Sequence, residues 1–347
     1  MTTEYCRVCG LPSSFPHSSF EQGTCIFCRN TEAGRPGTGG LNKEKALQDM
    51  AELFDSVRGS SYFDCIVCYS GGKDSTYVLR QVVREHKLRP LAFTIDNGFI
   101  AEESKRNIDR VTSNLGVEHH NIKISWDFLR NLVAASLFED LTPKKELQRV
   151  SSICSSCIFL VNTVAIKYAL QYQAPLIIAG FTGGQVPAAI YGNKLATNQK
   201  AREKRVNRLS ESLGDAAHHY FAIDAEQVQR AAPGPYHVNP LMAEDYSEEH
   251  VFEMIGDLGW KKPKDTGKCS TNCRLNSLGI NAHFTRHGFS PYARETAELV
   301  RTGCLSRERG LEIMEDVAFD GNVREALERL GISEEEYRTR LQEDRES

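Results

Sequence analysis

The sequence has no long hydrophobic run, because none of its apolar stretches approaches the ~18 residues that cross a bilayer. Its first six residues contain neither a basic stretch nor an apolar core, so we expect no secretory signal. A surplus of positive charge is also missing, since 46 acidic residues outnumber 42 lysines and arginines for a net charge of −4. These absences argue against a membrane partner, predict a cytoplasmic protein and give no general attraction to nucleic acid.

Two common nucleotide-binding patterns are absent as well. A Walker A loop needs four residues between its first glycine and Gly-Lys, and a dinucleotide site needs Gly-x-Gly-x-x-Gly. Between the apolar residues 63–69 and the helical spacing of residues 76–83 stands Ser70-Gly71-Gly72-Lys73-Asp74-Ser75. This order predicts a phosphate site, because glycines admit an anion closely and a helix N-terminus points N–H groups at it. An ordinary tight turn is the alternative.

Cysteine, in contrast, is plentiful, with eleven in 347 residues. Without a secretory signal, paired cysteines indicate metal sites more often than disulfides. Two Cys-x-x-Cys pairs lie near the N-terminus with fifteen residues between them, namely Cys6, Cys9, Cys25 and Cys28. We expect them to close a structural Zn²⁺ site, because four thiolates satisfy the ion and give a short lobe its folding energy. Four free cysteines are the alternative.

The middle of the chain alternates between strand-like and helix-like patterns. Short apolar strands are predicted at 63–69, 89–95, 118–124 and 173–179, with helices at 102–115 and 158–170 between them. This alternation predicts an α/β fold with a doubly wound parallel sheet, followed by a helical part from about residue 289. We divide the chain into a zinc knuckle and linker (1–40), a nucleotide domain (41–260) and a cysteine-containing segment with a helical C-terminal region (261–347).

Two residues follow predicted strands at the place where open α/β sheets bind ligands. Asp96 is expected to contact a ribose or a metal ion, with a simple Asp-Asn-Gly turn as the alternative. Gly180 begins a second glycine-rich turn, which ends at Gln185 and is expected to form the far wall of the nucleotide site. A loop that needs positive φ is the alternative there.

Four further cysteines lie in the second half of the chain. Cys154 and Cys157 open the apolar segment at 158–170, and thiols at i and i+3 can face one centre. Cys269 and Cys273 follow much later. Thiolates suit zinc as well as iron, so a second structural zinc site and a cluster site are both open at this point.

Basic residues gather in one polar stretch, which contains Lys194, Lys200, Arg202, Lys204, Arg205 and Arg208. We favour a solvated helix face for this stretch. A docking surface for a phosphate-rich or acidic partner is the alternative.

The loop at 70–75 resembles the SGGxDS signature of the PP-loop ATP pyrophosphatases, which split ATP between its α and β phosphates. The resemblance implies that ATP, with Mg²⁺, adenylylates a substrate oxygen so that a nucleophile can displace AMP. Ser70 through Ser75 would bind the phosphates, and Lys73 and Asp74 would take part in the reaction.

Both ends of the chain resemble the bacterial N-acetyl-sugar amidotransferases of surface-polysaccharide synthesis, which are PP-loop enzymes. The resemblance rests on the N-terminal cysteine pairs and on a C-terminal stretch that runs from Tyr292-Ala293-Arg294-Glu295 to Tyr337. It implies a nucleophile, ammonia, that a separate glutaminase supplies.

The middle of the chain instead resembles the PP-loop tRNA 2-thiouridine synthetases, in which three cysteines hold a 4Fe–4S cluster beside ATP. The resemblance implies that Cys154 and Cys157, with Cys269 or Cys273, hold such a cluster and take part in sulfur transfer. Those synthetases carry acidic residues after the strand that corresponds to residues 176–180, whereas residues 181–185 include no carboxylate here. The proton-handling residue therefore cannot be transferred to this chain.

The favoured function is an ATP-dependent sulfurtransferase, and the amidotransferase is the alternative. A non-catalytic zinc- and nucleotide-binding module is a third hypothesis, which a complete phosphate loop disfavours. The partners would be a small-molecule or tRNA acceptor and either a sulfur donor or a glutaminase. A homodimer is the oligomeric state that we keep open.

Overall fold

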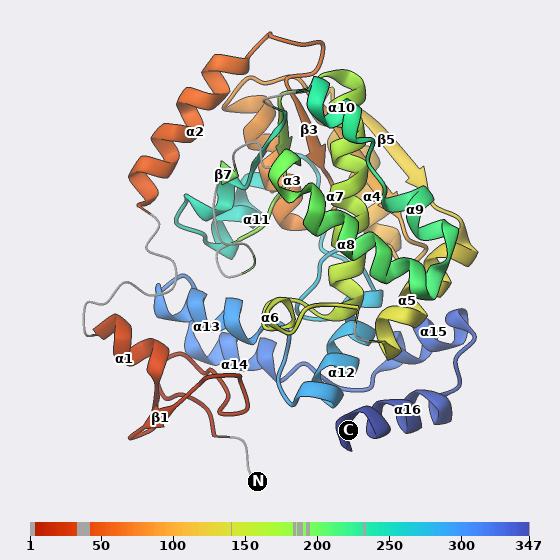
Figure 1. Cartoon of the computed structure of the whole chain (residues 1–347). Coiled ribbons are helices and arrows are strands. Elements are labelled where there is room, and N and C mark those ends of the chain that lie inside the picture. The colour runs from red at the N-terminus through yellow and green to blue at the C-terminus, as the bar shows by residue number, and fades with distance from the viewer. Residues whose placement is uncertain are drawn as a thin grey trace.

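The computed structural model describes residues 4–32, 42–139, 141–182, 185, 190–191, 195–231 and 234–346. Its centre is a six-stranded sheet in the order β5-β4-β3-β6-β8-β7 (Figure 1). The strands are β3 (Cys65–Cys68), β4 (Pro90–Asp96), β5 (Glu118–Lys123), β6 (Leu176–Ile178), β7 (Ile190–Tyr191) and β8 (Tyr236–Val238). All neighbours pair in parallel except the edge strand β7, which runs antiparallel to β8.

Helices cover both faces of this sheet, because successive side chains of a buried strand point to opposite sides. Cys65 and Val67 of β3 pack in one cluster and Ile66 in another. The first face carries α2 (Lys43–Val57), α3 (Lys73–Arg84), α4 (Glu102–Leu115) and α11 (Glu248–Gly256). The second carries α7 (Ser152–Tyr172) and α10 (Ala225–Arg230). The predicted doubly wound α/β class is therefore confirmed, with β7 as an antiparallel addition.

Helix α7 begins six residues before the predicted segment, so that Cys154 and Cys157 lie inside its first turns. Among the described residues it is the one helix that is long and apolar enough to cross a membrane. The apolar residues of α7 do not form one continuous run, because Lys167 and several hydroxyl side chains interrupt them. Its contacts are those of a core helix, since it packs against β3, β6, α5 (Trp126–Phe138), α9 (Asp215–Phe221) and α12 (Leu275–His287).

The C-terminal part is helical, as predicted. Beyond α12 it contains α13 (Ala293–Arg301), α14 (Arg307–Met314), α15 (Gly321–Leu330) and α16 (Glu334–Glu346). The hydroxyl of Ser306 accepts a hydrogen bond from the Arg309 N–H at 3.2 Å, and Ser333 does the same for Glu336 at 3.1 Å. Both serines therefore cap the N-termini of helices α14 and α16. The remaining elements are α6 (Lys144–Leu147), α8 (Leu195–Leu213) and the 3₁₀ turn η1 (Pro240–Met242).

The N-terminal lobe contains β1 (Phe20–Glu21), β2 (Thr24–Cys25) and α1 (Ile26–Glu32). It packs against α13 and α14 near the other end of the chain (Figure 1). Phe15 of the lobe shares a cluster with Phe289, Ala297 and Met314. The lobe is thus held by the helical C-terminal part, while the predicted linker at 33–41 lies outside the described residues. The three domain boundaries stay a prediction.

Candidate functional site

The phosphate loop joins β3 to α3, and α3 begins at Lys73. Gly71 has φ +76°, and a Cβ atom added to it would lie 2.7 Å from the Ser104 carbonyl oxygen of α4. Its own carbonyl accepts a hydrogen bond from the indole N–H of Trp260 at 3.0 Å. A glycine is therefore required here twice, by the backbone conformation and by the close approach of α4.

Replacement of Gly71 by alanine is expected to destabilise the protein by about 3 kcal/mol, because left-handed backbone and overpacking each cost on the order of 1 to 3 kcal/mol. Gly59→Ala is the matched control, since Gly59 has φ +75° but no atom within 4 Å of its added Cβ. Urea unfolding of both variants separates the two costs. Equal losses in both variants would contradict the close approach.

A segment from the C-terminal part lies across the phosphate loop. The Thr271 hydroxyl accepts a hydrogen bond from the Lys73 N–H at 3.0 Å, and the Ser104 hydroxyl donates to the Thr271 carbonyl at 3.1 Å. The hydroxyls of Ser70 and Ser75 are hydrogen-bonded to each other at 3.0 Å. The hydroxyls of Thr271, Ser70 and Ser75 thus lie at the N-terminus of α3, where an anion is favoured. No local pattern points to Thr271, because it lies 198 positions from Lys73.

The side chain of Lys73 lies in a polar cluster beside the loop. Its ammonium is 2.9 Å from the Asp74 carboxylate and 2.5 Å from the Tyr246 hydroxyl, which itself donates to Asp74 at 2.8 Å. The Glu248 carboxylate lies 3.8 Å from the same ammonium. Burial raises the pKa of Tyr246, so its hydroxyl keeps its proton as a donor. The cluster holds one cation next to the place where the loop would bind phosphates.

Asp96 and Gly180 both lie at the carboxyl ends of strands, as predicted. One oxygen of Asp96 accepts a hydrogen bond from the Gly98 N–H at 2.9 Å, which is the turn alternative. Gly180 follows β6, and a Cβ atom there would lie 3.1 Å from the Ser75 nitrogen. Its lack of a side chain therefore lets β6 approach the first turn of α3. Residues 183–184 of the predicted far wall lie outside the described residues.

Three of the four mid-chain cysteines converge. Cys154 and Cys157 come from the start of α7, and Cys273 comes from the segment that covers the loop. Burial raises the pKa of the Cys157 thiol, and the neighbouring Cys154 and Cys273 raise it further. Amide groups point at two of the sulfurs, with Asn276 Nδ2 donating to Cys154 at 3.6 Å and Asn97 Nδ2 to Cys273 at 3.4 Å.

The position of this thiol group is fixed by backbone contacts with the nucleotide domain. The Asn272 carbonyl accepts a hydrogen bond from the Ala101 N–H at 2.9 Å, and the Arg274 N–H donates to the Phe99 carbonyl at 2.9 Å. Cys273 lies between these contacts and two residues after Thr271. The three thiols therefore lie at the same edge of the sheet as the phosphate loop.

Cys269 is not part of this group. Its thiol donates to the Ile313 carbonyl at 3.6 Å, and after burial the nearby Asp316 carboxylate raises its pKa. Of the two candidates for the third ligand, the structure thus brings Cys273 to Cys154 and Cys157. Within the described ranges, these cysteines do not form a set that is compact enough for one ion, so the structure gives no support to the alternative of a second structural zinc site. A multi-iron cluster accepts a wider set of thiolates than a single ion does.

The N-terminal cysteines do form a compact set. The sulfurs of Cys6, Cys9, Cys25 and Cys28 all lie within 4.8 Å of one another. Cys6 and Cys28 are 3.8 Å apart and Cys9 and Cys25 are 3.7 Å apart. Zn–S bonds of about 2.3 Å in a tetrahedron place the sulfurs about 3.8 Å apart, so the residues fit a zinc ion. The guanidinium of Arg301 donates to Cys9 Sγ at 3.3 Å and offsets part of the thiolate charge.

One buried carboxylate at the site was missed as a functional residue. Glu295 of α13 accepts a hydrogen bond from the Thr182 hydroxyl, just after β6. From the sequence, Glu295 stands out only as part of the C-terminal stretch that resembles the N-acetyl-sugar amidotransferases. Nothing in its local pattern connects it with a loop 113 residues away.

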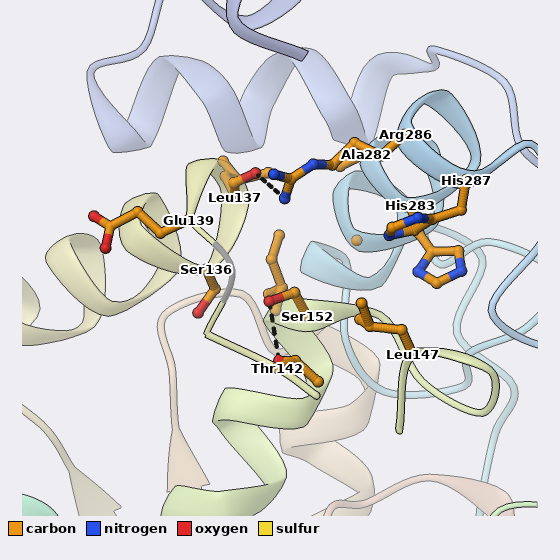
Figure 2. A pocket seen from close by; sticks show the side chains of 12 residues that line it. Ser136, Leu137, Glu139, Thr142, Leu147, Ser152, Ala282, His283, Arg286 and His287 are labelled. Atoms are coloured by element: carbon orange, nitrogen blue, oxygen red, sulfur yellow. Dashed lines mark hydrogen bonds between the residues drawn. The ribbon is translucent and has the colours of Figure 1, made fainter. Parts of the chain in front are cut away.

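A separate small cavity lies between the end of α5, the start of α7 and α12 (Figure 2). Its volume is about 20 Å³, which is room for a single water molecule. His283 lines it, and burial lowers the pKa of this side chain to about 3. The cavity is too small for a nucleotide, so the phosphate loop and the three thiols are the better candidate for a reaction site.

Comparison with known families agrees with this geometry. Residues 64–185, which contain β3, the phosphate loop, β4, β5 and β6, match the family model of queuosine biosynthesis protein QueC. This part of the chain, which contains the phosphate loop, is therefore similar to a family of PP-loop enzymes. Outside the matched residues, β8 extends the same sheet, and the segment that carries Thr271 contacts the phosphate loop.

A relative resembles the chain over most of its length. An uncharacterized protein of Methanocaldococcus jannaschii is 26% identical over 292 residues, which are 84% of this chain and 87% of that protein. The likeness therefore includes regions on both sides of residues 64–185.

Solved structures of three enzymes align with the chain at low TM-scores. The U34-tRNA thiolase NcsA of Methanococcus maripaludis, solved with its 4Fe–4S cluster, is 16% identical at a TM-score of 0.34, covering 96% of this chain and 100% of the thiolase. The NMN synthetase of Francisella tularensis is 15% identical at 0.37, and the ammonia-dependent NAD synthetase of Campylobacter jejuni is 13% identical at 0.36. Each covers 77% of this chain, and 96% and 97% of the respective synthetase. TM-scores of this size do not identify a function.

The basic stretch of the sequence is divided by the structure. Arg202 and Arg205 of α8 turn inward and stack on the Phe159 ring at 4.9 and 4.4 Å, and burial lowers the pKa of Arg202 to about 10. Lys200, Lys204 and Arg208 are exposed, whereas Lys194 lies outside the described residues. A solvated face with two inward arginines fits α8 better than a broad docking surface.

Proposed function

We propose that this chain is an ATP-dependent sulfurtransferase, which adenylylates a carbonyl or enol oxygen of its acceptor and replaces that oxygen with sulfur. The observation that carries the proposal is the convergence of Cys154, Cys157 and Cys273 beside the phosphate loop. Ammonia chemistry needs no thiol, so the amidotransferase leaves this convergence without a purpose. The three thiols are partly buried and burial raises the pKa of each, so a bound metal centre would be needed to stabilise them as thiolates.

In the first half-reaction the acceptor oxygen attacks the α-phosphorus of ATP and pyrophosphate leaves. The N–H groups of residues 70–75 and the ammonium of Lys73 would stabilise the charge that grows on the leaving group, with Mg²⁺ on the phosphates. In the second half-reaction sulfur attacks the activated carbon and AMP leaves. A 4Fe–4S cluster on the three cysteines would supply sulfur chemistry at this place, and Cys154, Cys157 and Cys273 would hold it.

The N-terminal lobe would bind one structural zinc ion through its four cysteines. These thiolates leave no open coordination position, so the ion would not take part in the reaction. Among the acceptors, the exposed part of α8 gives little support for a broad RNA surface. The test therefore includes a small-molecule acceptor pool beside tRNA.

Exchange of single cysteines separates the cluster ligands from their neighbour. After anaerobic reconstitution with iron and sulfide, Cys154→Ser, Cys157→Ser and Cys273→Ser are each expected to lose the visible absorption and the transfer of radiolabelled sulfide. Cys269→Ser is the matched control and is expected to keep both, because its thiol points to Ile313. The acceptors are unfractionated tRNA and a cell extract freed of macromolecules.

ATP binding should persist in all four variants, which excludes a general failure of folding. Colourless protein that is active with ammonium, and whose cysteine variants keep their activity, would overturn the sulfurtransferase in favour of the amidotransferase. Equal loss in the Cys269→Ser variant would contradict the assignment of the third ligand.

A further inference from the structure

A buried carboxylate lies beside the phosphate loop and has no part in the steps described so far. Glu295 is in the first turn of α13 and is 9% exposed. Its Oε1 accepts a hydrogen bond from the Thr182 hydroxyl, at the carboxyl end of the parallel sheet. Its Oε2 is buried and has no hydrogen-bond partner among the residues that the structure describes. One acceptor oxygen is thus held in place while the other is unpaired.

The surroundings of Glu295 favour its neutral form. Burial raises its pKa from 4.5 to about 7, and the negative charge of Asp74 adds to this effect. The Thr182 hydroxyl, the ammonium of Lys73 and the side chain of Gln185 act in the opposite direction. The charged and titratable groups around it are Asp74 and Lys73 from α3, Tyr246 before α11, Cys269 before α12 and Tyr292 at the start of α13. This set joins Glu295 electrostatically to the phosphate loop.

A buried carboxylate destabilises the folded protein, because its charge is removed from water. A glutamine would fill the same space without a charge to bury. Carboxyl groups whose pKa lies near neutrality are the ones that exchange protons at physiological pH. In addition, the loop after β6 has no carboxylate of its own in residues 181–185. Glu295 reaches the described part of that loop from a different element.

We propose that Glu295 is the proton-handling residue of the second half-reaction, where its carboxylate removes the proton from the incoming nucleophile. The inference rests on the proposed adenylylation, but it does not depend on whether the nucleophile carries sulfur or nitrogen. A bond forms between the nucleophilic atom and the activated carbon. The bond from that carbon to the AMP oxygen breaks, and its electron pair leaves with AMP. The proton of the nucleophile passes to Glu295, so no oxidant or reductant is consumed.

The first test is the titration of the carboxyl group itself. Infrared difference spectra between wild type and Glu295→Gln are expected to show one carboxyl that titrates near 7 in protein without ligands. Titration at the ordinary value of 4.5 would overturn the proposal, because the group would then be ionised throughout the neutral range. Thr182→Val removes a hydrogen bond that favours the charged form, so it should move the titration to higher pH.

The second test measures transfer from preformed adenylate, with sulfide and with ammonium in separate reactions and the two acceptor pools named above. Glu295→Gln is expected to slow transfer about a hundredfold, as is typical for loss of a general base. Formation of AMP and pyrophosphate should stay within a few-fold of wild type. The wild-type transfer rate should rise with pH through about 7, because the base form of Glu295 is required, and this rise should vanish in Glu295→Gln.

Two controls protect the interpretation. Glu312→Gln changes a carboxylate on α14 that is 56% exposed, and it should leave rate and pH profile unchanged. The second control is the free energy of unfolding as a function of pH. The raised pKa of Glu295 stabilises the folded state fully below pH 4.5, and this contribution is lost as the pH rises through about 7. Glu295→Gln should remove that loss, so above pH 7 its free energy of unfolding should exceed that of the wild type.

The failure of this inference differs from the failure of the proposed function. If ammonium alone supports transfer and Glu295→Gln slows it, the sulfurtransferase is wrong and the role of Glu295 stands. If Glu295→Gln keeps the wild-type rate and pH rise with the active nucleophile, the role of Glu295 is wrong. An equal loss of adenylylation and transfer would also overturn it, because Glu295 would then serve the site as a whole.

Discussion

Removal of the proposed zinc ion is expected to unfold residues 4–32 and to uncover one face of α13. The lobe has only two two-residue strands and one seven-residue helix, so it has little structure of its own to hold it together. Binding of zinc to four-cysteine lobes contributes on the order of 10 kcal/mol to folding. Hydrogen exchange before and after chelation is the measurement, and protection is expected to fall in the lobe and in the N-terminal half of α13.

A cysteine variant provides the matched control for this prediction. Cys9→Ser should reproduce the effect of chelation, whereas Cys304→Ser should leave the protection unchanged, because Cys304 lies outside the four-sulfur set. Protein that has lost its metal by elemental analysis and still protects residues 4–32 would contradict a structural role for the ion. The packing of Leu11 and Phe15 against Phe289 would then suffice to hold the lobe.

Replacement of Lys73 by alanine is expected to raise the barrier of adenylylation by about 3 kcal/mol, which is roughly a hundredfold in rate. The ammonium is the cation of the polar cluster at the start of α3, where it is 87% shielded from solvent and where Asp74 and Glu248 add negative charge. Its loss would leave these carboxylates to repel the phosphates of ATP. The formation of AMP and pyrophosphate from ATP is the measurement.

The control for Lys73→Ala is the replacement of another lysine that also forms an ion pair with an aspartate but is largely exposed to solvent. Lys45 forms an i,i+4 ion pair with Asp49 on α2 and is 67% exposed, so Lys45→Ala should leave the rate unchanged. Lys73→Arg should recover only part of the activity, because a planar guanidinium cannot place its charge as a compact ammonium does. If the products of wild type are ADP and phosphate, the assignment of this loop is wrong.

Local patterns predicted most of the sheet and both ends of the chain. The four predicted strands occur with boundaries shifted by at most three residues, and the predicted helix at 102–115 matches α4. These elements are set by apolar periodicity and by turn residues within one short window. The phosphate loop and the cysteine pairs were found for the same reason, since their chemistry is contained in a few consecutive residues.

The parts that sequence reasoning missed are contacts between distant segments. Tyr246, which contacts the Lys73 ammonium, lies 173 positions from that lysine in the sequence. Thr271, whose hydroxyl accepts a hydrogen bond from the Lys73 N–H, lies 198 positions from it. The sequence alone could not decide whether Cys269 or Cys273 joins Cys154 and Cys157, because both follow the nucleotide domain at a similar distance in the chain. Only the bridge between Ile100 and Cys273 decides which thiol turns toward α7. Such pairings depend on how a late segment is laid over an early one, and no local pattern records this.

Helix α13 joins two places that have different chemistry. Arg301 near its C-terminal end contacts a sulfur of the zinc set, and Glu295 near its N-terminal end contacts the loop after β6. At a rise of about 1.5 Å per residue, the two side chains start roughly 9 Å apart on one rigid rod. Loss of the proposed zinc ion would therefore disturb Glu295 through α13, although such an ion would contact neither ATP nor the acceptor. Inhibition by a chelator, and its rescue by added zinc, would then resemble metal catalysis even though the proposed ion is structural.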